Sequence, residues 1–190
     1  MNEPVIYTIG DSHAWHTWLK IPGVVTNPQG PMLMYTIGLP ENQRNWAKDI
    51  PIEAIVCFCW GEIDCRCHVY KYQPWQDCID RLVEGYLKTV SCSKETHKNI
   101  WIYNVAPPPR RNGAIESPGF PFLGSDDDRL EYVKYMNKKL SESEFTFVDV
   151  YDKYADKDGF LRMEISDAHV HIEDEKPLLE WVNLHRSCGL

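Results

Sequence analysis

A serine lies where the first apolar segment of the chain, Val5 to Ile9, gives way to polar residues. The segment is followed by Gly10-Asp11-Ser12-His13, in which the glycine permits a close approach of the backbone just before the serine. At a turn from a strand into a helix, the hydroxyl of Ser12 would lie at the sheet edge beside a helix N-terminus, which suits a nucleophile. By itself the pattern is more typical of a helix N-cap, because Asp and Ser both cap helices.

The partners that a serine nucleophile needs occur near the other end of the sequence, in Asp167-Ala168-His169-Val170-His171. A serine hydroxyl needs a base, and an imidazole base needs a carboxylate that fixes its tautomer and stabilises its positive charge. Asp167 and His171 are four residues apart, close enough on a turn or short helix for contact. We therefore predict a triad of Ser12, Asp167 and His171, with His169 as the alternative base.

Apolar runs that resemble strands alternate with helical or polar segments along the chain. Continuous apolar runs are typical of strands covered on both faces. The expected strands are Val5–Ile9, Val24–Thr26, Ile55–Trp60, Ile100–Val105 and Phe145–Val150, and the expected helices are Trp75–Val90, Asp126–Leu140 and Pro177–His185. Ser125 is the expected N-cap of the second helix. This alternation predicts an α/β fold with a mostly parallel sheet of about five strands and helices on both faces, in a single domain spanning residues 1–190.

Composition argues against several classes of partner. The chain has 20 Lys and Arg against 28 Asp and Glu, a net charge of −8, and its longest basic run is Arg110-Arg111. Nucleic acid is therefore an unexpected ligand, since binding it depends on many cationic side chains. No apolar stretch approaches the roughly 20 residues that span a bilayer, and the first residues lack the features of a secretion signal. We expect a cytoplasmic protein, whose oligomeric state the sequence does not indicate.

The seven cysteines are expected to be free thiols, mostly packed in the core. They lie at positions 57, 59, 65, 67, 78, 92 and 188. The spacing in the first four is C-x-C rather than the C-x₂₋₄-C of structural zinc sites, so we expect no metal there. A proline- and glycine-rich segment, Ala106–Gly124, follows the fourth expected strand, where loops of open α/β sheets form the binding crevice.

Four blocks together resemble the SGNH or GDSL-type hydrolases. They are Gly10-Asp11-Ser12, a glycine after the second strand, Gly61-x-x-Asp64 after the third, and the Asp and His before the last helix. The resemblance spans nearly the whole chain. It implies a three-layer α/β/α sandwich of flavodoxin-like topology and the activity of an esterase, lipase, carbohydrate acetylesterase or acyltransferase, with no metal or organic cofactor.

The same resemblance implies roles for particular residues. Ser12 would be the nucleophile, His171 the base and Asp167 its orienting partner. The oxyanion hole would use the backbone N–H groups of Ser12 and Gly30, with Gly38 as a weaker candidate for the second donor.

The chain departs from the pattern of these hydrolases in two blocks. Ile63 stands where the third block usually has an asparagine that donates to the oxyanion. The nearby charged donors are Arg66 and His68, which could substitute at the site wall or pair with Glu62 and Asp64; we favour pairing. The last block, normally Asp-x-x-His, is one residue longer here.

Two alternative functions remain open at this point. A metal-dependent phosphoesterase is suggested by Asp11-x-His13, Gly61-x-x-Asp64 and His169-x-His171, which imitate a two-metal ligand set. A catalytically weakened glycan-binding protein is suggested by the many aromatic residues, including Trp15 and Trp18, although at i, i+3 these two should share a buried helix face. We expect an enzyme that hydrolyses or transfers short acyl groups of a small-molecule or glycan ester, in particular carbohydrate O-acetyl groups.

Overall fold

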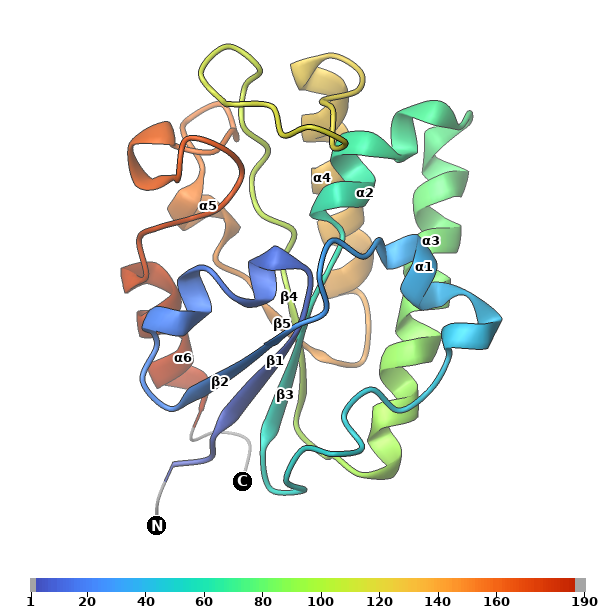
Figure 1. Cartoon of the computed structure of the whole chain (residues 1–190), viewed down its shortest axis with the longest axis vertical. Coiled ribbons are helices and arrows are strands. Elements are labelled where there is room, and N and C mark those ends of the chain that lie inside the picture. Colours follow the sequence, from blue (N-terminus) through green and yellow to red (C-terminus); the bar gives the residue numbers. More distant parts are fainter. Residues whose placement is uncertain (1–2, 187–190) are drawn as a thin grey trace.

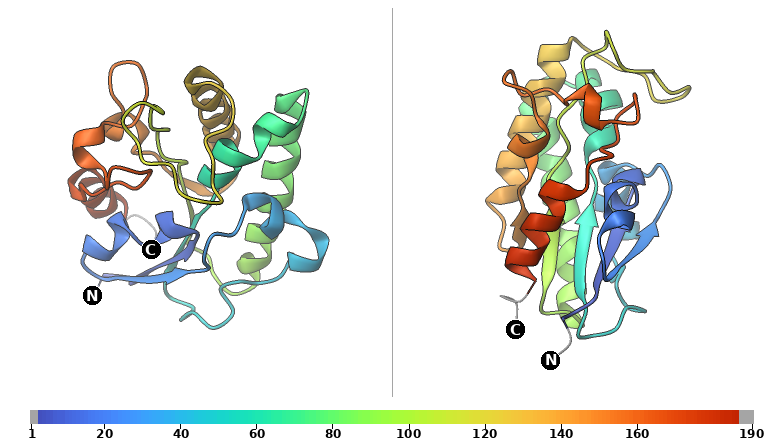
Figure 2. Two further views of the ribbon diagram at one scale, coloured as in Figure 1. Left: turned by 45° about the horizontal axis from the view of Figure 1, so that its top comes forward. Right: turned by 90° about the vertical axis from the view of Figure 1, so that its left-hand side faces the viewer.

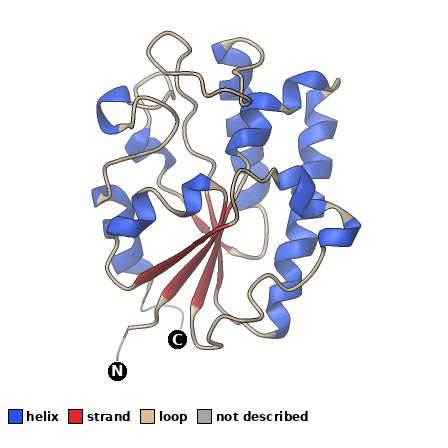
Figure 3. Ribbon diagram, viewed as in Figure 1, coloured by secondary structure: helices blue, strands red, loops and turns tan. Residues whose placement is uncertain are grey.

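Five short strands pair in parallel at the centre of the molecule. The structure is a computed structural model that describes residues 3–186 (Figure 1, Figure 3). The strands are β1 (Ile6–Gly10), β2 (Val24–Pro28), β3 (Ile55–Cys59), β4 (Ile100–Tyr103) and β5 (Thr146–Val148), in the order β2-β1-β3-β4-β5. Every neighbouring pair is parallel. The predicted sheet is thus confirmed, and its order is that of flavodoxin-like folds.

Helices lie on both sides of the sheet, as the edge-on view in Figure 2 shows. They are α1 (Met34–Gly38), α2 (Glu62–Cys67), α3 (Trp75–Ser91), α4 (Asp126–Ser141), α5 (Tyr151–Tyr154) and α6 (Lys176–His185). Short 3₁₀ helices occupy Ser12–Ala14, Thr17–Lys20, Pro40–Asn42, Val69–Lys71, Cys92–Glu95 and Met163–Ile165. Among these described helices none combines the length and apolar character that crossing a membrane requires.

Two hydrophobic layers hold the helices to the sheet. One layer packs α1, α3 and α4 against alternate strand residues such as Val56 and Phe58. The other packs the segment after β1 and α6 against the intervening residues, among them Ile55 and Cys57. Because side chains alternate across a strand, each buried strand supplies both layers, which explains the uninterrupted apolar runs in the sequence.

The expected long helices differ from the observed ones by only a residue or two at their ends. Ser125 caps α4 as predicted: its hydroxyl accepts the N–H of Asp128, and the Asp128 carboxylate accepts the N–H of Ser125. This reciprocal pair satisfies backbone groups that the first turn of a helix leaves open.

The segment after β1 differs from the expected helix. It forms two separate 3₁₀ helices, and Asp11 caps the first by accepting the N–H of His13 at 2.8 Å. Trp15 is consequently 43 % exposed while Trp18 is fully buried, so the expectation that both rings share one buried helix face is wrong. Trp15 ends the first 3₁₀ turn and Trp18 lies within the second, so the break between the two turns directs the two side chains apart.

The six described cysteines are all free thiols, and all but Cys92 are buried, as expected. Cys57 and Cys59 lie two residues apart on one face of β3, with their sulfur atoms 3.9 Å apart. Cys188 lies outside the described residues.

Gly10, the last residue of β1, lies where the backbones of β1 and β3 come closest. A Cβ atom at this position would collide with the carbonyl oxygen of Cys59. On the other side, the Gly10 carbonyl accepts the N–H of Gln29 at 2.6 Å. The glycine therefore lets β1 fit between its two neighbours immediately before Ser12.

We expect Gly10→Ala to lower the free energy of unfolding by about 3 kcal/mol or more, since over-packing costs about 1–3 kcal/mol even where side chains can yield. Urea denaturation measures this loss. Gly119→Ala is the control: its Cβ would meet open space, so only its positive φ opposes the substitution, at a cost of about 1–2 kcal/mol. An equal or smaller loss for Gly10→Ala would contradict the close-approach argument.

Candidate active site

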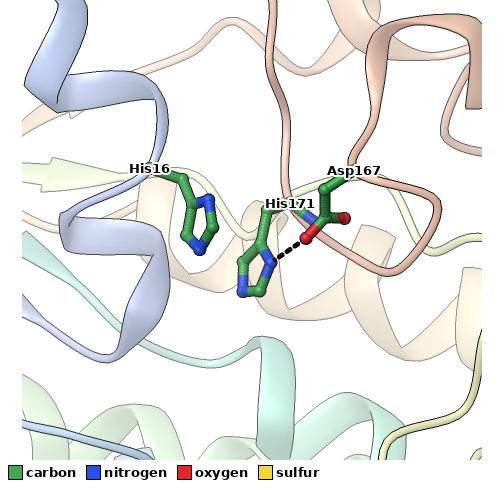
Figure 4. A group of neighbouring side chains, drawn as sticks. All are labelled: His16, Asp167 and His171. Atoms are coloured by element: carbon green, nitrogen blue, oxygen red, sulfur yellow. Dashed lines mark hydrogen bonds and ion pairs between the residues drawn. The ribbon is translucent and has the colours of Figure 1, made fainter.

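The structure brings together Ser12, His171 and Asp167, although Ser12 and His171 are 159 residues apart in the sequence. The Ser12 hydroxyl lies 2.8 Å from Nε2 of His171, and Nδ1 of the same ring lies 2.6 Å from Oδ2 of Asp167. In this arrangement Nδ1–H donates to the carboxylate and Nε2 is left to accept the serine proton. Figure 4 shows the Asp167 carboxylate directed at the His171 ring.

The loop that carries Asp167 and His171 is held by its own carboxylate. Oδ1 of Asp167 accepts the backbone N–H groups of His169 and His171, at 2.9 and 3.1 Å. The extra residue of this block is accommodated at Ala168, whose φ of 66° is unusual for a residue with a side chain. The longer spacing therefore still delivers the ring of His171 to Asp167.

His169, the alternative base, is directed away from Ser12. Its Nδ1 hydrogen-bonds the carbonyl oxygen of Ile115 at 2.8 Å, and the N–H of Ile115 donates to the carbonyl of Ala168 at 2.8 Å. These contacts tie the Ala106–Gly124 segment to the loop that carries the two histidines.

Two further histidines lie against His171: His13, which the sequence suggested only as a metal ligand, and His16, which it did not single out. His13 is buried, with Nδ1 3.1 Å from Asp11 and Nε2 3.2 Å from the carbonyl of Val170; its ring centroid is 5.1 Å from that of His171. The His16 ring stacks on His171 with the centroids 3.7 Å apart and the planes 7° apart. The sequence signal for His16 was only its position four residues after Ser12.

The surroundings of His171 favour its neutral form. Burial, followed by the positive charges of His13 and His16, lowers the pKa of His171 to about 4, although Asp167 acts in the opposite direction. Burial alone would raise the pKa of Asp167, but hydrogen bonds from His171 and from the backbone outweigh it and lower that pKa. The pair at neutral pH is therefore an uncharged imidazole beside a carboxylate.

His13 has the opposite shift. Burial acts to lower the pKa of His13, but the hydrogen bond and negative charge of Asp11 outweigh it and raise that pKa. The pKa values of these two neighbouring imidazoles are therefore shifted in opposite directions.

Backbone donors lie near the end of β1. The N–H groups of Ser12 and Gly30 donate no hydrogen bond within the part of the chain that the structure describes. Gly30 directly follows Gln29, whose N–H bonds Gly10, so both candidate donors flank the carboxyl end of β1. Gly38 instead packs against the backbone of Gly85 in α3. This close contact explains why position 38 holds a glycine, without an oxyanion role.

The block after β3 is occupied by structural interactions. Ile63 is buried, 4 % exposed, and offers no polar group. Arg66 donates through Nε and Nη2 to the Glu62 carboxylate and through Nη1 to the carbonyl of Phe120, so every guanidinium nitrogen has a partner. The predicted pairing of Arg66 with Glu62 is therefore observed.

His68 pairs with neither Glu62 nor Asp64, so the favoured pairing of these charged donors with the two carboxylates holds for Arg66 and not for His68. The buried Asp64 carboxylate instead accepts the backbone N–H groups of Met34 and Tyr35, at 2.7 and 3.1 Å. His68 lies between Tyr35 and Tyr72 at a cavity of about 380 Å³. Asp64 thus fastens the start of α1 to α2, and no side-chain amide replaces the missing asparagine in this block.

One cluster in the described residues has the side-chain types of a metal site: His16, Asp167 and His171. Imidazole lone pairs lie in the ring plane, so two rings stacked in parallel do not direct them at a common point. Both nitrogens of His171 already have protein partners. This geometry fits a hydrogen-bonded relay better than a coordination sphere, and the two-metal ligand set suggested by the sequence is not assembled.

No family model matches the sequence, and no curated protein matches it significantly. Solved structures do match. A GDSL-like lipase from Bacteroides thetaiotaomicron has a TM-score of 0.64 at 13 % identity, covering 100 % of this chain and 93 % of its own. Phospholipase A1 from Streptomyces albidoflavus has a TM-score of 0.55 at 8 % identity, covering 96 % and 99 %.

A protein from Slackia heliotrinireducens described as a candidate SGNH hydrolase has a TM-score of 0.55 at 15 % identity, covering 99 % of this chain and 100 % of its own. The chain has the SGNH-hydrolase fold. In this SGNH fold, Ser12 follows β1 and the Asp167–His171 loop precedes α6, in agreement with the block order on which the resemblance was based.

We expect the imidazole of His171 to titrate near pH 4, far below the value of about 6.5 for free histidine. Proton–carbon correlation NMR of the histidine rings measures this midpoint, with the signal assigned by its loss in His171→Gln. In Asp167→Asn the midpoint should fall further, because the carboxylate that favours the charged ring is gone. A midpoint above pH 6 in the unsubstituted protein would contradict the described environment.

Proposed function

We propose that this protein is a serine hydrolase that cleaves short acyl esters. The observation that carries the proposal is the continuous hydrogen-bonded series from the Ser12 hydroxyl through His171 to Asp167, with distances of 2.8 and 2.6 Å. An SGNH fold with these residues at the carboxyl edge of the sheet supports it. Other proteins with this fold include a GDSL-like lipase and a phospholipase A1.

In the proposed reaction, Nε2 of His171 takes the Ser12 proton as Oγ bonds to the ester carbonyl carbon, and the carbonyl oxygen becomes an oxyanion. The N–H groups of Ser12 and Gly30 would stabilise that oxyanion, and Asp167 would stabilise the imidazolium. When the intermediate collapses, the bond from the carbonyl carbon to the alcohol oxygen breaks, and the alcohol leaves with the proton from His171. Water, or the hydroxyl of an acceptor, then attacks the acyl carbon and gives its proton to Nε2 of His171. The bond from that carbon to Oγ of Ser12 breaks, and Oγ takes the proton back from His171.

For the substrate, we propose O-acetyl groups on a carbohydrate, hydrolysed or transferred. Trp15 supports a sugar-binding role, since its ring is 43 % exposed and lies 4.9 Å from the ring of His16, which stacks on His171. An exposed indole face beside the reacting groups suits the apolar face of a sugar ring. The glycan-binding alternative shares this feature but does not need the Ser12–His171 hydrogen bond.

A fluorophosphonate probe should form one covalent adduct, on Ser12, detected by intact mass and peptide mapping. Ser12→Ala should form none, and His171→Ala should label roughly 10²–10⁴-fold more slowly because the general base is lost. His169→Ala is the matched control and should label at the unsubstituted rate. A chelator should leave the rate unchanged. Folded protein that forms no adduct, or labelling that depends on a divalent metal, would overturn the proposal.

Replacing Trp15 by alanine should raise KM for an O-acetylated oligosaccharide about threefold to tenfold, the worth of one aromatic contact. Hydrolysis of 4-nitrophenyl acetate, which has no sugar ring, should keep its KM. Leu19→Ala, which removes an exposed apolar side chain from the neighbouring turn, is the control. Equal changes with both substrates would count against a carbohydrate substrate.

A further inference from the structure

The His16 ring covers one face of the His171 ring. The two planes are nearly parallel, 7° apart, with centroids separated by 3.7 Å (Figure 4). Both hydrogen bonds of His171, to Ser12 and Asp167, are made through its edge. The stacking contact of His16 therefore does not compete with these two hydrogen bonds. It restrains rotation of the His171 ring out of its plane, which the two hydrogen bonds alone resist only weakly.

His16 is itself held by a small ionic network. Its Nδ1 lies 3.5 Å from Oε1 of Glu173, and the second carboxylate oxygen of Glu173 accepts a 2.6 Å hydrogen bond from Nζ of Lys20. Lys20 also donates to the backbone carbonyl of Glu173 at 2.6 Å. The hydrogen bond from Lys20 lowers the pKa of Glu173, which keeps the carboxylate ionised. Glu173 is two residues beyond His171, so the network spans the two segments that supply Ser12 and His171.

We propose that His16 is a positioning residue of this site, which holds the His171 ring in the plane that serves both Ser12 and Asp167. This inference rests on the proposed function, because it assigns His171 the role of base. The His16 backbone N–H donates to the Ser12 carbonyl oxygen at 3.2 Å, but the imidazole of His16 hydrogen-bonds neither Ser12 nor Asp167, and His16 is not assigned a catalytic step.

The pKa of His171 depends on every charged group that faces its ring, so a change at His16 also alters that pKa. From its own loop, Asp167 favours the charged form of the ring; from the segment after β1, His13 and His16 oppose it. Glu173 lies on the far side of this pair and contacts His16. Replacing His16 by a ring that cannot be charged therefore removes one of the two groups that lower the pKa of His171, and should make His171 easier to protonate.

A second histidine stack in the molecule supplies a matched control. His185 lies on Trp181 in α6 with centroids 3.9 Å apart and planes 11° apart, and neither ring contacts the proposed triad. If stacking served only to stabilise the fold, changes at His16 and His185 would affect stability alone. If His16 positions the base, only His16 variants would alter the pH dependence of activity.

The experiment compares His16→Phe, His16→Ala and His185→Phe by the pH profile of kcat/KM for 4-nitrophenyl acetate, with thermal melting of each variant as a check on folding. His16→Phe keeps a stacked ring without charge: at pH 8 it should retain activity within about twofold, with the acid limb of its profile raised by about one pH unit. His16→Ala removes the stacked ring and should lose about tenfold or more in kcat at pH 8, with KM little changed. His185→Phe should match the unsubstituted profile.

Several outcomes would overturn the inference. Unchanged kcat and an unchanged acid limb in both His16 variants would do so, as would the same shift in His185→Phe. If His16→Ala does not fold, the acid limb of His16→Phe decides. The failure of the proposed function is a separate result: unsubstituted protein that neither labels at Ser12 nor hydrolyses the ester refutes the serine mechanism before His16 is considered.

Discussion

The hydrogen bond between Ser12 and His171 imposes the strongest demand on this fold, because it joins groups 159 residues apart to within 2.8 Å. A parallel sheet meets that demand, since all its strands end at one edge and the loops that follow them share the same space. Gly10 brings β1 close to β3 immediately before the serine. On the opposite side, the Asp167 carboxylate fixes the backbone of its own loop while it binds the ring of His171. Both ends of the hydrogen bond are thus fixed by local backbone interactions.

Asp64 makes a comparable connection between two other loops. It is fully buried, and burial raises its pKa to about 7 even though two backbone N–H groups bind it. Those N–H groups belong to Met34 and Tyr35, at the start of α1, shortly after Gly30. The block after β3 therefore fixes the path of the chain after β2. Its contribution in this protein is to hold the backbone, since Ile63 brings no donor to the site.

Features that depend on local sequence were predictable, and features that depend on ring orientation or helix type were not. Continuous apolar runs separated by helical or polar segments predicted the five strands. Ser125 and the acidic residues after it predicted the start of α4. The spacing of Asp167 and His171 predicted their contact. The stacking of His16 on His171 depends on how two 3₁₀ turns place the residues between them, which no spacing rule specifies. The expectation that Trp15 and Trp18 share a face failed for the same reason. The partners of Asp64 could not be predicted because they are backbone groups, whose positions follow from the tertiary arrangement.

The adjacent thiols of β3, Cys57 and Cys59, are buried and shielded from electrophiles. Burial raises the pKa of the Cys59 thiol far above its usual range, and the hydrogen bond with the free thiol of Cys57 raises it further. Because thiolates rather than thiols are the reactive species, the sulfur atom of Cys59 is a poor target for alkylating and oxidising agents. Cys65 is protected in the same way, and among the described cysteines only Cys92 is partly exposed. The interior of the sheet is therefore rich in sulfur, but its thiols are unreactive. The hydroxyl of Ser12, after β1, is the more accessible nucleophile in this region.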